Sequence, residues 1–201
     1  LPRHVQTVFV TQHEALGLGH AVLCARPVVG NEPFAVLLPD DMIWNRGRGA
    51  LHQMADLAER EQASVIAVED VPREHTNRYG IVSAERVDEH VARVQGVVEK
   101  PKPEVAPSTL AIVGRYILQP RIFDLLETTR AGTGGEIQLT DGIAALLGND
   151  PVLAYRFIGR RFDCGNRLGM VQATVHLALE DPELHNAVVA MMRERLAQEA
   201  N

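Results

Sequence analysis

The sequence predicts an α/β fold in which helices cover a mixed, mainly parallel sheet, and two patterns indicate it. Residues 34–38 are a continuous apolar run that ends in Pro39-Asp40-Asp41, as expected for a strand buried on both faces. Ala50–Glu61 carries its apolar residues on one helical stripe, and residues 64–68 are a second strand-like run. Because strand, helix and strand follow one another, the expected class is α/β.

The other elements follow from the same patterns, and the chain reads as one domain over residues 1–201. Further strands are expected at residues 5–10 and 152–157, and further helices at residues 18–26, 120–128, 136–147, 168–179 and, as a C-terminal helix, 183–199. Between residues 79 and 116 short apolar runs alternate with polar turns and prolines, which indicates hairpins or a lateral sheet.

Composition argues against two classes of partner. The 201 residues are 46% hydrophobic, which is enough for one domain with a sizeable core. The 20 Lys and Arg residues are dispersed and the formal net charge is −6, so no nucleic acid is expected as a partner. No apolar run approaches the roughly 18 residues that cross a bilayer, so no membrane is expected either. Cys24 and Cys164 lack a metal-ligand spacing, which favours a reducing cytoplasm.

A glycine-rich segment, residues 11–21, lies between a predicted strand and a predicted helix. Glycines at such a place let a ligand approach backbone N–H groups, and a helix N-terminus favours an anion or the polar edge of a ring. The same glycines also suit a tight turn from strand to helix. Taken alone, the segment would favour the tight turn.

Carboxylates follow two of the predicted strands. Asp40 and Asp41 end the apolar run of residues 34–38, and Asp163 lies at a turn after the strand of residues 152–157. Open α/β sheets bind ligands at strand ends, and Mg²⁺ prefers one or two carboxylates together with phosphate oxygens. We therefore expect Asp40 and Asp163 to form a divalent-metal site if they converge. An Asx turn or a helix N-cap is the alternative, and it is the expected role of Asp41.

A third apolar strand ends in Glu99-Lys100-Pro101. Adjacent strand residues point to opposite faces, so Glu99 and Lys100 can reach one point only if the strand end is kinked, which Pro101 would assist. A lysine is a strong donor for a sugar phosphate and a glutamate accepts hydrogen bonds from sugar hydroxyls. An exposed, salt-bridged strand end is the alternative.

Seven blocks of the sequence resemble, in the same order, those of bacterial UTP–glucose-1-phosphate uridylyltransferases. The blocks are Gln12 with residues 14–21, then residues 38–41, 78–82, 96–101, 106–116, 135–141 and 162–165. Together they extend over nearly the whole chain. The resemblance implies a Rossmann-like nucleotidyltransferase fold and the transfer of a uridylyl group from UTP to glucose 1-phosphate, which gives UDP-glucose and pyrophosphate with Mg²⁺ as cofactor.

The resemblance also implies roles for the residues that bind nucleotide and metal. Gln12 and the backbone of Gly17 match the positions that recognise the pyrimidine edge. Asp40 and Asp163 match the pair that holds the catalytic Mg²⁺. Lys100 matches the catalytic cation that contacts the phosphate of glucose 1-phosphate.

The remaining matches surround the sugar. Gly80 and Glu99 correspond to positions around glucose 1-phosphate, with Glu99 on the sugar hydroxyls. Gly114 corresponds to the strand that lines the sugar pocket. Glu136, Thr140 and Asp141 correspond to a helix start close to it, although a carboxylate such as Glu136 also stabilises a helix dipole without any ligand.

The chain departs from this family at its N-terminus. Members open with a first strand and a loop of the form Gly-x-Gly-Thr-Arg that grips the triphosphate, and neither occurs here. We therefore interpret the chain as the C-terminal two-thirds of such a protein. Alone, it is expected to expose a strand edge, to bind UDP-glucose weakly and to be a poor catalyst.

Two alternatives remain for the function, and one expectation concerns assembly. Another sugar-1-phosphate nucleotidyltransferase, such as a thymidylyltransferase, would share most of the blocks. A non-catalytic module that binds a sugar nucleotide would share them too. The full-length protein is expected to be a homo-oligomer that acts on UTP, glucose 1-phosphate and UDP-glucose.

Overall fold

The computed structural model describes residues 5–132 and 135–199. The helices are α1 (Leu18–Cys24), α2 (Arg26–Val29), α3 (Ala50–Glu61), η1 (Arg73–Arg78, a 3₁₀ helix), α4 (Ile122–Thr128), α5 (Leu139–Leu146), α6 (Arg167–Glu180) and α7 (His185–Glu199). The strands are β1 (Phe34–Leu37), β2 (Asp41–Trp44), β3 (Ser64–Asp70), β4 (Gly80–Arg86), β5 (Val91–Glu99), β6 (Leu110–Leu118), β7 (Val152–Arg156) and β8 (Arg160–Asp163).

Six strands form the main sheet in the order β1-β6-β3-β7-β5-β4, and one residue pair, Ile81 with Ala111, links β4 back to β6. The α/β class and the mixed sheet are confirmed, but the mainly parallel pairing is wrong. Among the described strands only β3 and β7 pair in parallel, and the others pair antiparallel. The expected lateral sheet is part of this main sheet. The connection between β4 and β5 is too short for a crossover, so that pair must be antiparallel.

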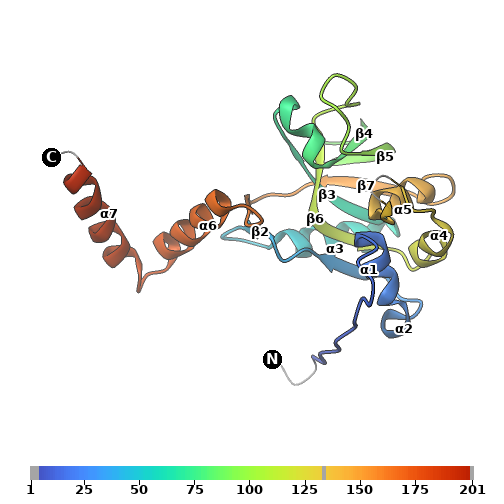
Figure 1. Ribbon diagram of the computed structural model, residues 1–201, viewed down its shortest axis with the longest axis horizontal. Helices are drawn as coiled ribbons and strands as arrows, with labels where there is room; N and C mark the ends of the chain where they lie inside the picture. Colours follow the sequence, from blue (N-terminus) through green and yellow to red (C-terminus); the bar gives the residue numbers. More distant parts are fainter. Residues whose placement is uncertain (1–4, 133–134, 200–201) are drawn as a thin grey trace.

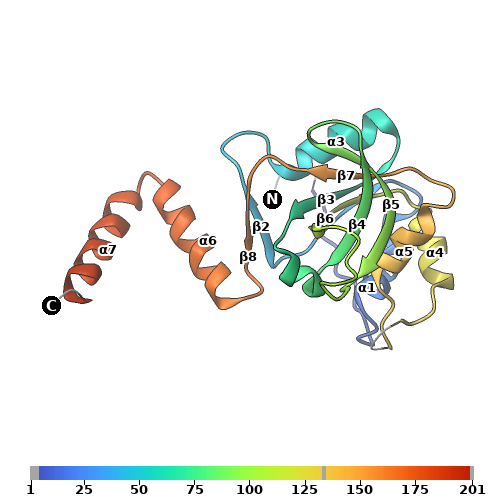
Figure 2. The same cartoon turned by 90° about the horizontal axis from the view of Figure 1, so that it is seen from above.

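Two hydrophobic cores lie on opposite faces of the sheet because strand residues alternate between faces. Val65 and Ala67 of β3 pack with α3, whereas Ile66 and Val68 face the core that includes α4 and α5. Figure 1 shows α1, α4 and α5 grouped beside the sheet, and Figure 2 shows α3 on the opposite side of the sheet from them. The predicted bounds of α3 are confirmed, and Met54, Leu57 and Ala58 of its apolar stripe are buried.

The strand predicted at residues 5–10 is wrong. These residues have no regular secondary structure, and the side chain of Phe9 is 92% exposed. A β-branched run forms a strand only when a partner accepts its backbone hydrogen bonds, and no described strand pairs with this segment.

Strand β1 forms as predicted, but its expected burial on both faces is wrong. Its side chains alternate between half-buried and exposed, and Leu37 is 49% exposed. It pairs only with β6 among the described strands, so its other edge is open, as expected for this chain. An edge strand is covered less completely than a central one.

Strands β2 and β8 form a second, two-stranded ribbon that the sequence patterns did not reveal. Helix α6 follows β8 after a short turn, and α7 contacts α6 near the turn that joins them. Figures 1 and 2 both show α6 and α7 extending away from the main sheet as an arm, with the ribbon at its base. The predicted C-terminal helix is confirmed as α7.

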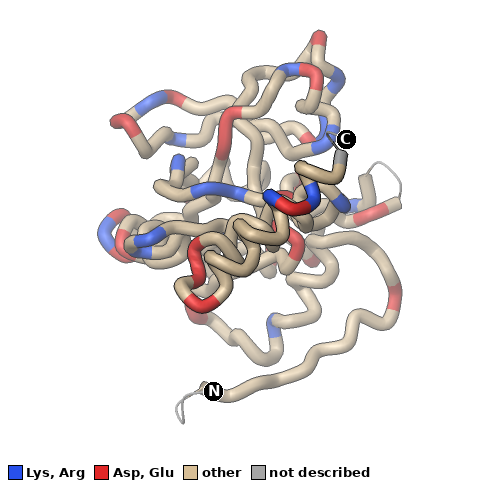
Figure 3. Tube along the Cα trace, turned by 90° about the vertical axis from the view of Figure 1, so that its left-hand side faces the viewer, with Lys and Arg blue, Asp and Glu red and all other residues tan. Residues whose placement is uncertain are grey.

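Lys and Arg residues alternate with Asp and Glu along the chain trace in Figure 3 rather than gathering into one basic stripe. Within residues 5–132 and 135–199, every helix is too short or too polar to cross a bilayer.

Candidate active site

A cavity of about 270 Å³ opens where the ends of β1, β4, β5 and β8 approach strand β6. Seven of the residues singled out in the sequence line it: Asp40, Asp41, Gly80, Glu99, Gly114, Thr140 and Asp163. They come from six separate segments of the chain. The other predicted residues, Gln12, Gly17, Lys100, Glu136 and Asp141, are outside this lining.

Asp40 and Asp163 converge, as the metal hypothesis requires. A Cβ placed on Gly165 would lie 3.0 Å from Asp40 Oδ2 and 3.2 Å from Asp163 Oδ1, so both carboxylates face one small volume. The backbone N–H of Cys164 donates to the carbonyl of Asp40 at 2.7 Å, which ties the two segments together. A side chain at position 165 would fill the space between the two carboxylates.

Two carboxylates fit Mg²⁺, which uses few protein ligands and completes its shell with phosphate oxygens and water. Among the described residues no group of three or more His, Cys, Asp and Glu side chains could hold a metal by itself. The cavity therefore suits a metal that arrives with an anionic ligand better than a fully protein-bound ion.

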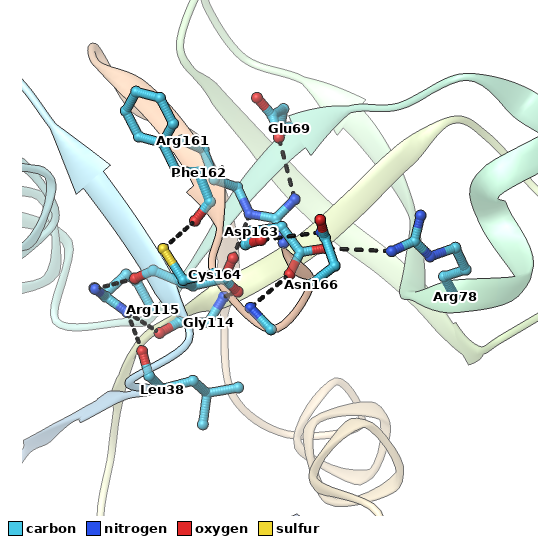
Figure 4. Close-up of polar contacts among 12 residues, drawn as sticks. Leu38, Glu69, Arg78, Gly114, Arg115, Arg161, Phe162, Asp163, Cys164 and Asn166 are labelled. Carbon is cyan, nitrogen blue, oxygen red and sulfur yellow. Dashed lines mark hydrogen bonds and ion pairs between the residues drawn. The ribbon is translucent and has the colours of Figure 1, made fainter. Parts of the chain in front are cut away.

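Arg78 approaches the same carboxylates from η1. Its Nη2 lies 3.2 Å from Asp163 Oδ2, and the guanidinium lies over the ring of Tyr79. Figure 4 shows Arg78 pointing at Asp163 from the side opposite Gly114 and Leu38. Arg78 is half exposed, so this pair is weak and can exchange with a ligand.

Asp41 forms a buried ion pair instead of the expected Asx turn or helix N-cap, so that prediction is wrong. Its Oδ1 lies 2.5 Å from Arg161 Nε, and the two side chains are 10% and 8% exposed. Its Oδ2 accepts a hydrogen bond from the backbone N–H of Gly114 at 2.7 Å. Burial opposes the charge of Arg161, but the hydrogen bond and charge of Asp41 outweigh it and raise the pKa of the guanidinium.

Gly114 is needed where β6 passes beneath Asp41. A Cβ there would lie 2.7 Å from the Cβ of Leu38 and 2.8 Å from Asp41 Oδ2, closer than real Cβ atoms approach. The adjacent Arg115 donates to the carbonyls of Leu38 and Asp41. Gly114 thus lets strand β6 pack closely against Leu38 and Asp41 at the cavity.

The sugar-side residues also lie together. Thr140 Oγ1 donates to Glu99 Oε2 at 3.0 Å, and a Cβ on Gly80 would lie 2.7 Å from Thr140 Cγ2. Glu99 keeps its second oxygen, Oε1, on the side of Lys100, 3.5 Å from Nζ. This region offers carboxylate and hydroxyl groups of the kind that bind sugar hydroxyls.

Lys100 lies at a kinked strand end, and its exposed side chain pairs with Glu99, which is the alternative stated above for this strand end. Its φ is 44°, in the left-handed region, and Pro101 follows it. The Lys100 side chain is 56% exposed and lies at the rim of the cavity rather than among its lining residues.

Gln12, Gly17 and Glu136 form a separate group beside the cavity. Gln12 Nε2 donates to the carbonyl of Gly17 at 3.1 Å and lies 3.0 Å from His20 Nδ1. Gly17 has a φ of 96°, and a Cβ there would lie 2.9 Å from Glu136 Cβ, so glycine is required. Leu18, the next residue, lines the cavity, which makes this group its neighbour.

The predicted helix start at Glu136 is wrong. Helix α5 begins at Leu139, after an extended Gln138, and Glu136 accepts a hydrogen bond from Gln138 Nε2 at 2.8 Å. Thr140 does lie in the first turn of α5 and contacts Glu99. The periodic spacing of apolar residues placed the predicted helix start three residues too early. Residues 136–138 instead precede the helix and pack against Gly17 and Gly19.

Acidic groups dominate the cavity and act on their neighbours. Tyr116 lies on its floor, where burial first, and then the charges of Asp41 and Glu99, raise the pKa of the phenol. Its hydroxyl therefore stays protonated and can donate. Acidic surroundings of this kind attract cations rather than a bare anion.

Arg78, Arg161 and the role of Asp41 were missed in the sequence. Arg161 had one usable signal, because it lies two residues before Asp163 on the same strand and so shares a face with it. Arg78 begins one of the blocks that carry the resemblance, at residues 78–82, but its position beside Asp163 depends on how η1 packs.

Comparisons with known proteins identify the family of the chain. A sequence model of the family described as nucleotidyl transferase matches residues 2–179. A UTP–glucose-1-phosphate uridylyltransferase of Pseudomonas aeruginosa is 50% identical over 167 residues, which cover 83% of this chain and 60% of that protein.

Two solved structures are also similar. A UTP-bound UGPase from Acinetobacter baumannii superposes with a TM-score of 0.85 at 43% identity and covers 100% of this chain and 68% of that one. A UDP-glucose pyrophosphorylase complexed with UDP-glucose has a TM-score of 0.82 at 40% identity and covers 85% and 65%. The chain spans 60% of the length of the Pseudomonas relative and 64% of that of a Staphylococcus haemolyticus relative. This chain belongs to the nucleotidyl transferase family.

Proposed function

We propose that the chain carries the sugar- and metal-binding part of a UTP–glucose-1-phosphate uridylyltransferase. The observation that supports this most is the convergence of Asp40 and Asp163 at one end of a cavity whose other end holds Gly80, Glu99 and Thr140. Carboxylates for a metal thus lie beside groups for a sugar.

In the proposed reaction a phosphate oxygen of glucose 1-phosphate attacks the α-phosphorus of UTP. The bond from the α-phosphorus to the bridging oxygen breaks, and pyrophosphate leaves with that bond's electrons. Such chemistry depends mostly on positioning and on neutralising charge. A bound Mg²⁺ would offset the charge at the phosphates.

The residues of the chain divide this work by their position. Asp40 and Asp163 would hold Mg²⁺, and Glu99 and Thr140 would bind sugar hydroxyls. Lys100, at the rim beside Glu99, would approach the sugar phosphate. No step requires a covalent bond to the protein.

Gln12 and Gly17 would recognise the uracil ring next to the cavity. A side-chain amide donates and accepts hydrogen bonds at once, so it matches the alternating edge of a pyrimidine. Gln12 must leave His20 to do so, because its amide nitrogen is already engaged there.

A non-catalytic module that binds UDP-glucose is the second candidate. Among the described lining residues the cations are Arg78 and Arg161, and both are paired with carboxylates. This leaves few donors for the triphosphate of UTP and favours product binding over turnover by these residues alone.

We further propose a cytoplasmic location and assembly into a homo-oligomer. The two cysteines, Cys24 and Cys164, are free thiols, which suits a reducing compartment. The arm of α6 and α7 exposes large apolar side chains, among them Met170, Met191 and Leu196, and such a surface favours burial against another copy.

Calorimetry with UDP-glucose, with and without Mg²⁺ and beside an assay of pyrophosphate release, tests the function. We expect Mg²⁺ to raise the affinity for UDP-glucose by about tenfold, and Asp40→Asn to abolish that gain because one of two carboxylates is lost. Asp56→Asn, an exposed carboxylate on α3, is the matched control and should keep the gain. Binding heat without turnover would favour the module, and absence of heat would reject both candidates.

Lys100→Met should weaken binding of glucose 1-phosphate by about tenfold, because a charge-assisted hydrogen bond to a phosphate is lost. The midpoint of thermal unfolding should change little, since the side chain is half exposed. Lys102→Met, an exposed lysine two residues away, serves as control. Equal affinities for all three proteins would leave Lys100 an ordinary surface lysine.

Gln12→Ala should weaken UTP binding by about tenfold and glucose 1-phosphate binding much less, because only the nucleotide presents a pyrimidine edge. Gln95→Ala, an exposed residue of β5, is the control. Isothermal titration of each ligand measures the ratio. Equal losses for both ligands would instead indicate that Gln12 supports the turn at Gly17.

Light scattering should show an oligomer of the chain, and Met191→Glu on α7 should dissociate it because a charge cannot be buried in an apolar contact. Val87→Glu, equally exposed between β4 and β5, should not. A monomeric wild-type chain at micromolar concentration would contradict the assembly.

A further inference from the structure

The ribbon of β2 and β8 carries both candidate metal carboxylates at one end. Asp40 immediately precedes β2, Asp163 is the last residue of β8, and Asp41 is the partner of Asp163 across the ribbon. Its described backbone pairing is internal, so strand hydrogen bonds do not join it to the main sheet. Its position relative to the sugar-side residues is therefore set by its short connections to β1 and β7 and by side-chain contacts.

Asp41 and Arg161 form the buried ion pair among these contacts, and Arg115 of β6 adds hydrogen bonds to the carbonyls of Leu38 and Asp41. Asp41 accepts hydrogen bonds from Gly114 N–H of β6 at 2.7 Å and from Arg161 Nε. Arg161 Nη1 reaches Glu69 Oε2 of β3 at 3.4 Å, and its guanidinium lies 5.3 Å from the ring centroid of Tyr79. Figure 4 shows Arg161 extending from the ribbon toward Glu69 on the neighbouring strand of the sheet.

The burial of the Asp41–Arg161 pair indicates that it fixes geometry more than it stabilises the fold. Both side chains are about nine-tenths buried, and removing two charges from water costs much of what their attraction returns. Apolar side chains of similar volume often stabilise a fold as well or better. What they lack is direction, because a guanidinium and a carboxylate fix the distance and angle between the elements they join.

We propose that the Asp41–Arg161 pair is a positioning device, which holds the metal carboxylates of the ribbon at the spacing from Glu99 and Gly114 that one bound sugar nucleotide requires. This inference rests on the proposed function. Neither residue contacts the reacting atoms, and both act through Asp40 and Asp163. The pair sets how strongly a metal and a sugar nucleotide assist each other's binding.

The test compares the wild-type chain with the double variant Asp41→Leu/Arg161→Met, which replaces the buried charges by apolar groups of similar size. Calorimetry with UDP-glucose, with and without Mg²⁺, gives the gain in affinity that Mg²⁺ produces. We expect that gain to fall from about tenfold to below about threefold, because outer-shell residues commonly affect metal affinity by such factors. The midpoint of thermal unfolding should stay close to that of the wild type.

Arg160→Met is the matched control, since Arg160 is the preceding residue of β8 but is exposed and contacts Phe162. The Arg160→Met variant should keep the full gain in UDP-glucose affinity that Mg²⁺ produces. If the double variant does not unfold cooperatively, Arg161→Lys gives the same reading, because it retains the charge but cannot reach Asp41 and Glu69 together.

The outcomes separate this proposal from the function on which it rests. A wild-type chain that shows no Mg²⁺-dependent gain rejects the proposed function and the positioning role with it. A wild-type gain that the folded variants retain in full rejects the positioning role and leaves the proposed function intact. A gain lost only together with the cooperative unfolding transition of both variants also rejects it, in favour of a purely structural pair.

Discussion

Strand β6 is the constraint on which the rest of the structure depends. It pairs with β1 on one side and β3 on the other, and at Ala111 it also meets the start of β4. Its side chains alternate, so Val113 and Ile117 pack toward α3 while Ile112, Gly114 and Tyr116 line the cavity. One strand therefore supports a core and a binding site at once.

This arrangement connects the two sides of the cavity to the main sheet in different ways. The side proposed to bind a sugar is built on the main sheet, where Gly80 and Glu99 are opposite each other in paired strands and Thr140 contacts Glu99. The side proposed to bind a metal is built on a two-stranded ribbon, which contacts that sheet through side chains that include Asp41 and Arg161. A few buried polar contacts fix the position of the ribbon relative to the sheet only while all of them are formed.

The electrostatics of the cavity follow from the same construction. Strands that end together bring several carboxylates into one volume, and the cations there, Arg78 and Arg161, are each held by one of them. An acidic cavity binds an anionic nucleotide only if positive charge enters with it. The proposed Mg²⁺ would supply that positive charge.

The sequence by itself determined the α/β class, the bounds of α3 and the residue types of the site, because these depend on local period and on motifs such as Asp40-Asp41. Only the tertiary structure decided which strands pair, since pairing depends on where distant segments meet rather than on local period. It also decided that residues 5–10 lack a strand partner and that Asp41 is buried against Arg161, 120 positions away. Convergence of side chains from separate segments is a property of the folded chain alone.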